Sequence, residues 1–174
     1  TPMPDPKREA QVEQGFGVQN VDTGKGGAYL ATLRDEIIPW VDARYPTSKE
    51  RALIGYSLGG LFAMYAMFES TDTFTHYLLG SPSMYWNDKA MFQVEEAYAG
   101  KHKDLRALVF ISAGVDEDAD HVGNVLRMTR VLQDRNYPGL ELQRDIFPNQ
   151  THTQGVGATM ARGLLWLFGS AEKK

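Results

Sequence analysis

A serine stands between two glycines in the segment Gly55-Tyr56-Ser57-Leu58-Gly59, which matches the pattern GxSxG. A short apolar run precedes this segment and a wholly apolar stretch follows it. In hydrolases the pattern marks a sharp strand-to-helix turn, in which glycine at both outer positions avoids collisions with neighbouring backbone. This context predicts Ser57 as a nucleophile and the backbone N–H of Leu58 as a donor to a developing oxyanion. The alternative interpretation is a glycine-rich turn with an incidental serine.

A serine hydroxyl needs a general base, and the chain contains four histidines. His152 lies after the last predicted strand and before the final predicted helix, where the chain order serine, acid, histidine puts the base. We therefore expect Ser57 Oγ to lie within hydrogen-bond reach of His152 Nε2. His76 and His102 are interpreted as surface residues. His121 begins a predicted helix among acids, which favours an exposed ion pair. For His152 the alternative is a loop histidine satisfied by water.

Four carboxylates follow the third predicted strand: Asp116, Glu117, Asp118 and Asp120. Such a loop is ordinarily solvated, with acids that cap the next helix. Its position at the end of a strand makes one of these acids a candidate to orient the imidazole. Asp118 and Asp120 are better placed to cap the helix that begins near His121. Asp116 and Glu117 both stay open as the orienting acid.

Composition excludes several classes of protein. The 174 residues include 18 Lys and Arg against 22 Asp and Glu, a net charge of −4, so no nucleic-acid partner is expected. Every apolar stretch is far shorter than the roughly 20 residues that a membrane span needs. Without cysteine the chain has no thiol nucleophile, disulfide or cysteine-based metal site. Serine chemistry needs no cofactor and no metal, and we expect none of either.

The elements that must position these residues follow from hydrophobic periodicity. Short apolar runs predict four strands, at residues 51–56, 77–80, 105–113 and 140–147. Apolar spacings of three or four predict helices at residues 30–45, with a kink at Pro39, and at 61–68, 91–98, 122–132 and 156–168. Alternating strands and helices predict an α/β fold with a mostly parallel sheet, helices on both faces and chemistry at the carboxyl ends of the strands. Residues 1–27, rich in Pro and Gly, predict an irregular segment.

Four stretches together resemble the putative-esterase group of α/β-hydrolases, which takes in esterase D-like enzymes and siderophore trilactone esterases. The stretches are GYSLGGLFA, the segment LGSPSMYW, the helix RDEIIPWVDARYP and the turn from Gly114 to Glu117. The resemblance spans about residues 26–168 in order. It implies an α/β-hydrolase fold and ester hydrolysis through an acyl-enzyme intermediate. Acyl transfer or thioester hydrolysis would use the same residues, and a non-catalytic binding or carrier module on this fold is the rival from another class.

The resemblance also implies roles for individual residues. It makes Ser57 the nucleophile and His152 the base, and it selects Glu117 as the acid because the group has a glycine-x-x-acid pattern, counted here from Gly114.

The LGSPSMYW segment is implied to contribute to the substrate site. Four of its residues are similar to residues that line the acyl or siderophore pocket: Ser81, Ser83, Tyr85 and Trp86. Their alternative interpretation is a loop with a proline turn and aromatic packing.

Four strands are about half of the sheet that this group of enzymes has, and its second oxyanion donor comes from a loop after an early strand. Nothing before Gly27 supplies these parts. We expect residues 1–174 to form a single α/β-hydrolase domain that lacks its N-terminal strands. The expected partners are a small-molecule ester and the N-terminal half of the enzyme, as a separate chain or as residues outside this sequence, against the strand at 51–56. The cellular compartment stays open.

Overall fold

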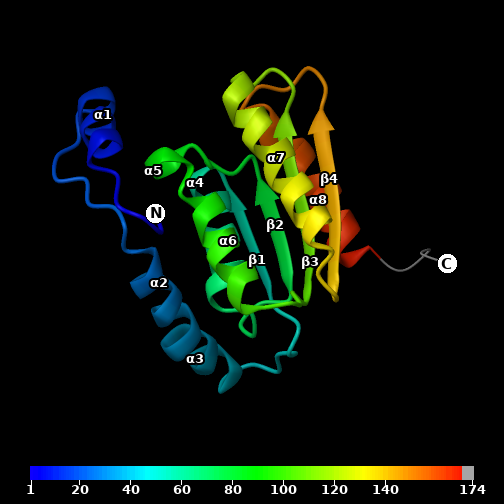
Figure 1. Ribbon diagram of the computed structural model, residues 1–174. Helices are drawn as coiled ribbons and strands as arrows, with labels where there is room; N and C mark the ends of the chain where they lie inside the picture. The colour runs from blue at the N-terminus through cyan, green and yellow to red at the C-terminus, as the bar shows by residue number, and fades with distance from the viewer. Residues whose placement is uncertain (170–174) are drawn as a thin grey trace.

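The computed structural model describes residues 1–169, and its centre is a four-stranded sheet (Figure 1). The strands are β1 (Ala52–Tyr56), β2 (His76–Gly80), β3 (Ala107–Gly114) and β4 (Leu140–Phe147). They lie in the order β1-β2-β3-β4, and each pairs in parallel with the next. The predicted parallel sheet is confirmed, with all strand boundaries within two residues of the expected ones. Residues 170–174, which belong to the expected domain 1–174, lie outside the described residues.

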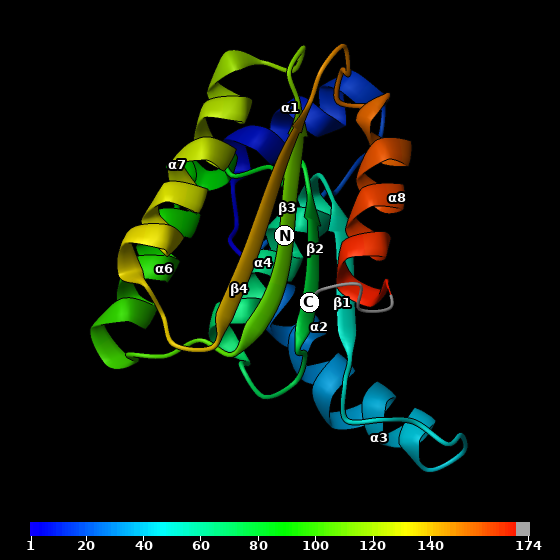
Figure 2. The same ribbon diagram turned by 90° about the vertical axis from the view of Figure 1, so that its right-hand side faces the viewer.

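Helices cover both faces of the sheet, as the alternation of elements predicts. On one face lie α4 (Leu58–Glu69), α6 (Met91–Lys101) and α7 (Ala119–Arg135), and on the other lies α8 (Gly155–Phe168) (Figure 2). The larger hydrophobic core lies between the sheet and the helices α4, α6 and α7. The apolar helix α4 contributes buried residues to it from several sides. A smaller core of Leu78, Phe110 and Leu167 lies under α8.

The long helix expected at residues 30–45 forms as three consecutive pieces: α2 (Gly26–Thr32), the π-helical η1 (Leu33–Ile37) and α3 (Ile38–Asp42). Pro39 has no backbone N–H to donate to the preceding turn. The distortion expected at Pro39 takes the form of a π segment immediately before it. Leu30 is buried in the larger core, which fixes this helix beside α4.

A helix forms near the N-terminus, where the sequence predicts an irregular segment. In α1 (Pro6–Phe16) the Asp5 side chain accepts the N–H of Arg8 at 3.1 Å, and Pro6 takes the first position, where an N–H is not needed. The helix buries none of its residues, so no apolar stripe marks it in the sequence. The residues just before this helix contact the segment that follows β2. The Trp86 indole N–H donates to the carbonyl of Met3 at 2.9 Å.

β1 and β4 are the two edges of the sheet. β1 pairs only with β2 within the described chain, and Ile54 on this strand is 41% exposed. The alternating pattern of residues 140–147 correctly indicates an edge strand. Within residues 1–169 no helix has the length and apolar character needed to cross a bilayer.

Candidate active site

Ser57 occupies the turn between β1 and α4, with φ 58° and ψ −120°. A positive φ is rare for a residue with a side chain and indicates local strain. Three backbone hydrogen bonds hold the turn: Ser57 N–H donates to Gly80 O at 2.9 Å, and Ser57 O accepts from Leu61 at 3.0 Å and Ser83 at 3.1 Å. Leu58 is the first residue of α4, so its N–H is a helix N-terminal donor without an intrahelical acceptor.

The glycines around Ser57 are not equally constrained. A Cβ on Gly55 would lie 2.1 Å from the carbonyl oxygen of Gly59, which is an impossible contact. A Cβ on Gly59 itself would meet nothing within 4 Å, so the expectation that crowding requires glycine there is wrong. The second crowded position is Gly60, whose added Cβ would lie 2.9 Å from Gly80 O. The close approach of α4 to the end of β2 therefore rests on Gly60.

This asymmetry predicts opposite outcomes for two matched substitutions. Gly55→Ala is expected to lower the free energy of unfolding by at least about 1–3 kcal/mol, the usual cost of overpacking. Gly59→Ala, in open space on α4, is expected to raise it by up to about 1 kcal/mol, because alanine favours helix. Urea unfolding curves measure both. Equal losses at the two positions would contradict the geometry.

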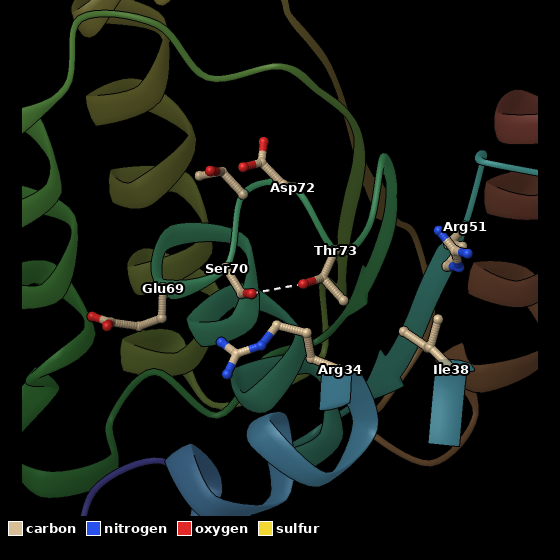
Figure 3. A pocket seen from close by; sticks show the side chains of 8 residues that line it. Arg34, Ile38, Arg51, Glu69, Ser70, Asp72 and Thr73 are labelled. Carbon is tan, nitrogen blue, oxygen red and sulfur yellow. Dashed lines mark hydrogen bonds between the residues drawn. The ribbon is translucent and has the colours of Figure 1, made fainter. Parts of the chain in front are cut away.

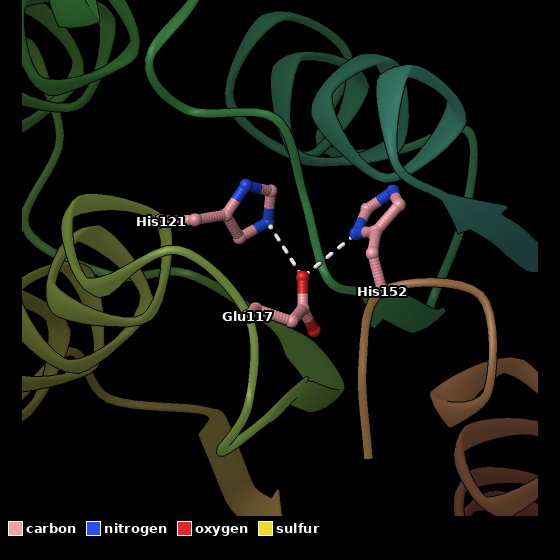
Figure 4. A group of neighbouring side chains, drawn as sticks. All are labelled: Glu117, His121 and His152. Atoms are coloured by element: carbon pink, nitrogen blue, oxygen red, sulfur yellow. Dashed lines mark hydrogen bonds and ion pairs between the residues drawn. The ribbon is translucent and has the colours of Figure 1, made fainter.

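His152 and Glu117 contact each other at the carboxyl end of the sheet (Figure 4). The Nδ1–H of His152, in the loop after β4, donates to Glu117 Oε2 at 2.7 Å. The other carboxylate oxygen accepts the N–H of Gly114, the last residue of β3, at 2.6 Å. The Glu117 side chain is 2% exposed and that of His152 is 41% exposed. A buried carboxylate thus fixes the orientation of an imidazole that solvent can reach.

Burial opposes ionisation of Glu117, but hydrogen bonds from Ser81, Gly114 and His152 outweigh it and hold the pKa of Glu117 below its ordinary value. Glu117 is therefore a carboxylate at neutral pH, and Nδ1 of His152 carries the proton between them. In a neutral imidazole this leaves Nε2 unprotonated and able to act as a base. Asp116, the alternative acid, is exposed.

Tyr56 links the serine turn to the histidine loop. Its hydroxyl donates to the backbone carbonyl of His152 at 2.6 Å, and the two rings lie 5.3 Å apart between centroids. Burial, together with the charge of Glu117, raises the pKa of Tyr56 to about 12, so its hydroxyl keeps the proton that it donates. His152 is thereby held next to the residue that precedes Ser57.

The Ser57 hydroxyl is paired with Ser83, not with His152. The two serine Oγ atoms lie 3.1 Å apart, and within residues 1–169 no hydrogen bond joins Ser57 to His152. The expected contact between Ser57 Oγ and His152 Nε2 is thus not formed in this conformation. Contacts of this kind are often loose or absent in unliganded enzymes and tighten when substrate binds.

Ser81 lies beneath these side chains. Its hydroxyl donates to Glu117 Oε2 at 2.5 Å and lies 2.9 Å from His121 Nε2 and 3.2 Å from His152 Nδ1. Ser81 is fully buried and has a positive φ of 38°. Its backbone is therefore strained in the position that brings one hydroxyl into contact with three polar side chains.

His121 is buried, with 8% exposure, where the sequence favours an exposed ion pair. Its Nε2–H donates to the carbonyl of Ser81 at 3.1 Å, and Nε2 lies 3.5 Å from Glu117 Oε2. Asp118 caps α7 and accepts the N–H of His121, which turns this side chain inward in the first turn of the helix. Burial lowers the pKa of His121, although Glu117 opposes the shift. Glu117 precedes the N-cap of α7, so no helical spacing in the sequence marks this contact.

Asp118 caps α7 as expected, whereas Asp120 accepts a hydrogen bond from Lys89 at 2.6 Å.

One group of side chains that could hold a metal ion occurs among the described residues. Glu117, His121 and His152 each offer one ligand atom, and the three atoms lie within 4.8 Å of one another.

The residues that follow β2 differ in how far they reach the cavity beside the site. Ser83 is fully buried and Trp86 is 3% exposed. Tyr85 is half-buried and lines a cavity of about 330 Å³ together with Arg8, Asp118, Asp120 and His121. The Arg8 guanidinium lies 4.8 Å from the centroid of the Tyr85 ring. The expected place of Ser81, Ser83, Tyr85 and Trp86 in a substrate pocket stays a prediction.

A larger cavity, of about 480 Å³, lies at the opposite end of the sheet (Figure 3). Its lining residues are Arg34, Ile38, Arg51, Glu69, Ser70, Thr71, Asp72 and Thr73. None of them is a histidine, and the Ser70 hydroxyl is paired with Thr73 at 2.6 Å. This cavity has no serine with a base beside it, so the candidate chemistry belongs to the carboxyl ends of the strands.

Known proteins resemble this chain both in sequence and in fold. The chain is 34% identical to the siderophore triacetylfusarinine C esterase of Aspergillus fumigatus over 83% of its length, and 37% identical to the ferri-bacillibactin esterase BesA of Bacillus subtilis over 80%. It spans 59% and 51% of the length of these two relatives. The solved structure of the BES protein from Bacillus cereus superposes with a TM-score of 0.78 at 24% identity, covering 87% of this chain and 58% of that one.

The siderophore hydrolase EstA from Aspergillus nidulans superposes with a TM-score of 0.71 at 20% identity, over 89% of this chain and 60% of that one. These likenesses show the α/β fold that the sequence predicts. The family model described as "Putative esterase" matches residues 3–148, which contain the Ser57 turn and Glu117. The chain belongs to the putative-esterase family.

Proposed function

We propose that the protein is a serine hydrolase that cleaves carboxylic esters, with Ser57 as nucleophile, His152 as general base and Glu117 as the acid that orients it. The observation that carries this proposal is the hydrogen bond between buried Glu117 and Nδ1 of His152, beside the strained Ser57 turn. Because Nδ1 is the donor in this bond, the neutral form of the imidazole has Nε2 free to accept a proton, as a general base requires.

The proposed reaction has two halves. Ser57 Oγ attacks the ester carbonyl carbon while His152 Nε2 takes its proton, and the Leu58 N–H donates to the oxyanion. Collapse of this intermediate releases the alcohol, protonated by His152, and leaves an acyl-enzyme. Water then attacks the acyl carbon and gives a proton to His152. His152 returns this proton to Ser57 Oγ as the second intermediate collapses and releases the acid. Glu117 stabilises the imidazolium in both halves.

For this reaction Ser57 Oγ must leave Ser83 Oγ and turn toward His152. Because Tyr56 holds the His152 loop next to this turn, rotation of the serine side chain is the smallest movement that could make the contact. We propose the unliganded arrangement as a resting state.

The proposed substrates are siderophore-type esters or small acyl esters. The support is the two relatives named as siderophore esterases, which share 34% and 37% identity with this chain. Hydrolysis of a short p-nitrophenyl ester, followed by absorbance, tests the reaction class. A folded protein without such activity on any ester would favour a binding module on the same fold.

We also propose that further strands of the enzyme pair with the free edge of β1 and supply the second oxyanion donor. The unpaired side of β1 and the partial exposure of Ile54 support this proposal. A monomer of these 174 residues alone with full esterase activity would contradict it.

Tyr56→Phe is expected to lower kcat by about 10- to 100-fold, because a catalytic group displaced by about 1 Å can cost this much. Loss of one hydrogen bond should reduce the free energy of unfolding by only about 1 kcal/mol. Steady-state kinetics and urea unfolding of the same sample separate the two effects. Tyr65→Phe, on α4 away from the His152 loop, is the matched control. An unchanged kcat in Tyr56→Phe would contradict the positioning role.

A further inference from the structure

Four polar atoms from three loops and the first turn of α7 converge at the carboxyl end of the sheet. They are Glu117 Oε2, His121 Nε2, His152 Nδ1 and Ser81 Oγ. Glu117 Oε2 lies 2.7 Å from His152 Nδ1 and 3.5 Å from His121 Nε2. Ser81 Oγ lies 2.5, 2.9 and 3.2 Å from the atoms of Glu117, His121 and His152. The two histidine nitrogens lie within 4.8 Å of each other.

These separations match the spacing of ligands around zinc. Bonds of 2.0–2.1 Å in a tetrahedron put neighbouring ligand atoms about 3.3 Å apart. Five of the six separations fall between 2.5 and 3.5 Å, and the sixth is at most 4.8 Å. Two imidazole nitrogens with one carboxylate oxygen are ligands that zinc commonly takes in proteins. Small movements of these side chains would therefore accommodate the ion.

The surroundings also suit a metal ion. The carboxylate of Glu117 is already held from behind by the Gly114 N–H at 2.6 Å, the kind of outer contact that orients a ligand. Access is through His152, whose side chain is 41% exposed, whereas Glu117 is 2% exposed.

We propose that Zn²⁺ binds reversibly to Glu117, His121 and His152, with Ser81 beside it, and thereby inhibits the esterase. The inhibition rests on the proposed function, whereas the binding does not. Among the described residues every buried side-chain polar atom already has a hydrogen-bond partner, so the cluster is satisfied without metal. To bind, zinc must displace the protons on Nδ1 of His152 and Nε2 of His121. Zinc therefore competes with these protons for the site, and the fold does not depend on the metal.

Inhibition follows from the loss of the proton on Nδ1. With zinc on that nitrogen, His152 no longer donates to Glu117, and the positive ion disfavours the imidazolium that forms when Nε2 accepts a proton from Ser57. The base is thereby disabled while the Ser57 turn stays as it is.

Equilibrium dialysis of the protein against Zn²⁺ alone tests the site, with Ser57→Ala as the background so that no chemistry is needed. We expect one zinc per chain, and His121→Gln should weaken binding by more than about 100-fold, beyond the 10- to 100-fold that an outer contact costs. The matched control is His102→Gln, because His102 stacks on Tyr98 away from the cluster. Its zinc affinity should not change.

Inhibition is then measured on the enzyme with Ser57 present. The zinc concentration for half-inhibition should rise in His121→Gln by the same factor as the dissociation constant. Thermal unfolding without metal checks that His121→Gln is folded. If it is not, His121→Asn replaces it in both measurements, because it also removes the imidazole and leaves Glu117 and His152 in place. Zinc binding that depends on His121 in a protein without esterase activity would refute the proposed function alone. An active enzyme whose zinc affinity is the same in His121→Gln and His102→Gln overturns the site.

Discussion

Ser57→Ala is expected to lower kcat for a short p-nitrophenyl ester by about 10⁶-fold, the loss found when a serine protease loses its nucleophile. The methyl group cannot form an acyl-enzyme, so only the oxyanion donor and substrate binding remain. Removing the hydroxyl also frees Ser83 Oγ, which is 3.1 Å away, but leaves the backbone of the turn unchanged. Steady-state rates, corrected for hydrolysis in buffer, measure the effect.

Ser70→Ala is the matched control for this substitution. Ser70 lines the cavity at the other end of the sheet, where its hydroxyl is hydrogen-bonded to Thr73 at 2.6 Å. Its kcat should equal that of the unmodified protein. A Ser57→Ala protein that keeps a tenth or more of the activity would show that another residue is the nucleophile.

Glu117→Gln is expected to lower kcat by about 10⁴-fold, as loss of the orienting acid does in serine proteases. An amide is nearly isosteric with the carboxylate, but it carries no charge and can present an N–H to the imidazole. His152 would then favour the wrong tautomer and its imidazolium would lose its counter-ion. Activity is measured with the same ester, at several pH values.

Asp116→Asn is the comparison for Glu117→Gln, because both changes remove one carboxylate from the same loop. Asp116 is exposed, whereas Glu117 is buried against His152, so the large loss should fall on Glu117. A crippled Asp116→Asn beside an active Glu117→Gln would reassign the acid. Full activity in both variants would mean that Ser57 and His152 work as a pair.

The sheet could be predicted because its strands are short, continuous apolar runs. Val109, Phe110 and Ile111 of β3 are buried on both faces, which is the pattern that a covered parallel strand requires. The Ser57 turn could be predicted because a glycine two residues before the serine has a single physical reason, the contact of 2.1 Å that any Cβ would make. Where a single steric or packing requirement determines the residue type, the local structure can be predicted from the sequence.

The burial of His121 could not be predicted, because it depends on contacts between distant segments. A histidine at the start of a helix beside acids is ordinarily solvated. Here Ser81, at the end of the neighbouring strand, and the rings of Tyr85 and His152 enclose it. The helix α1 could not be predicted for a different reason. It buries no residue, so hydrophobic periodicity does not mark it, and the only sequence signal for it is the N-cap Asp5 followed by Pro6.

The strands stand in the sheet in the same order as in the chain. During synthesis each strand can therefore add to the edge left by the one before, without waiting for a later segment to insert between them. With the proposed roles, Ser57 emerges first, Glu117 second and His152 last, after β4. A ribosome-bound chain would hold the serine without its base until the loop after β4 has emerged, and hydrolytic activity could begin only then.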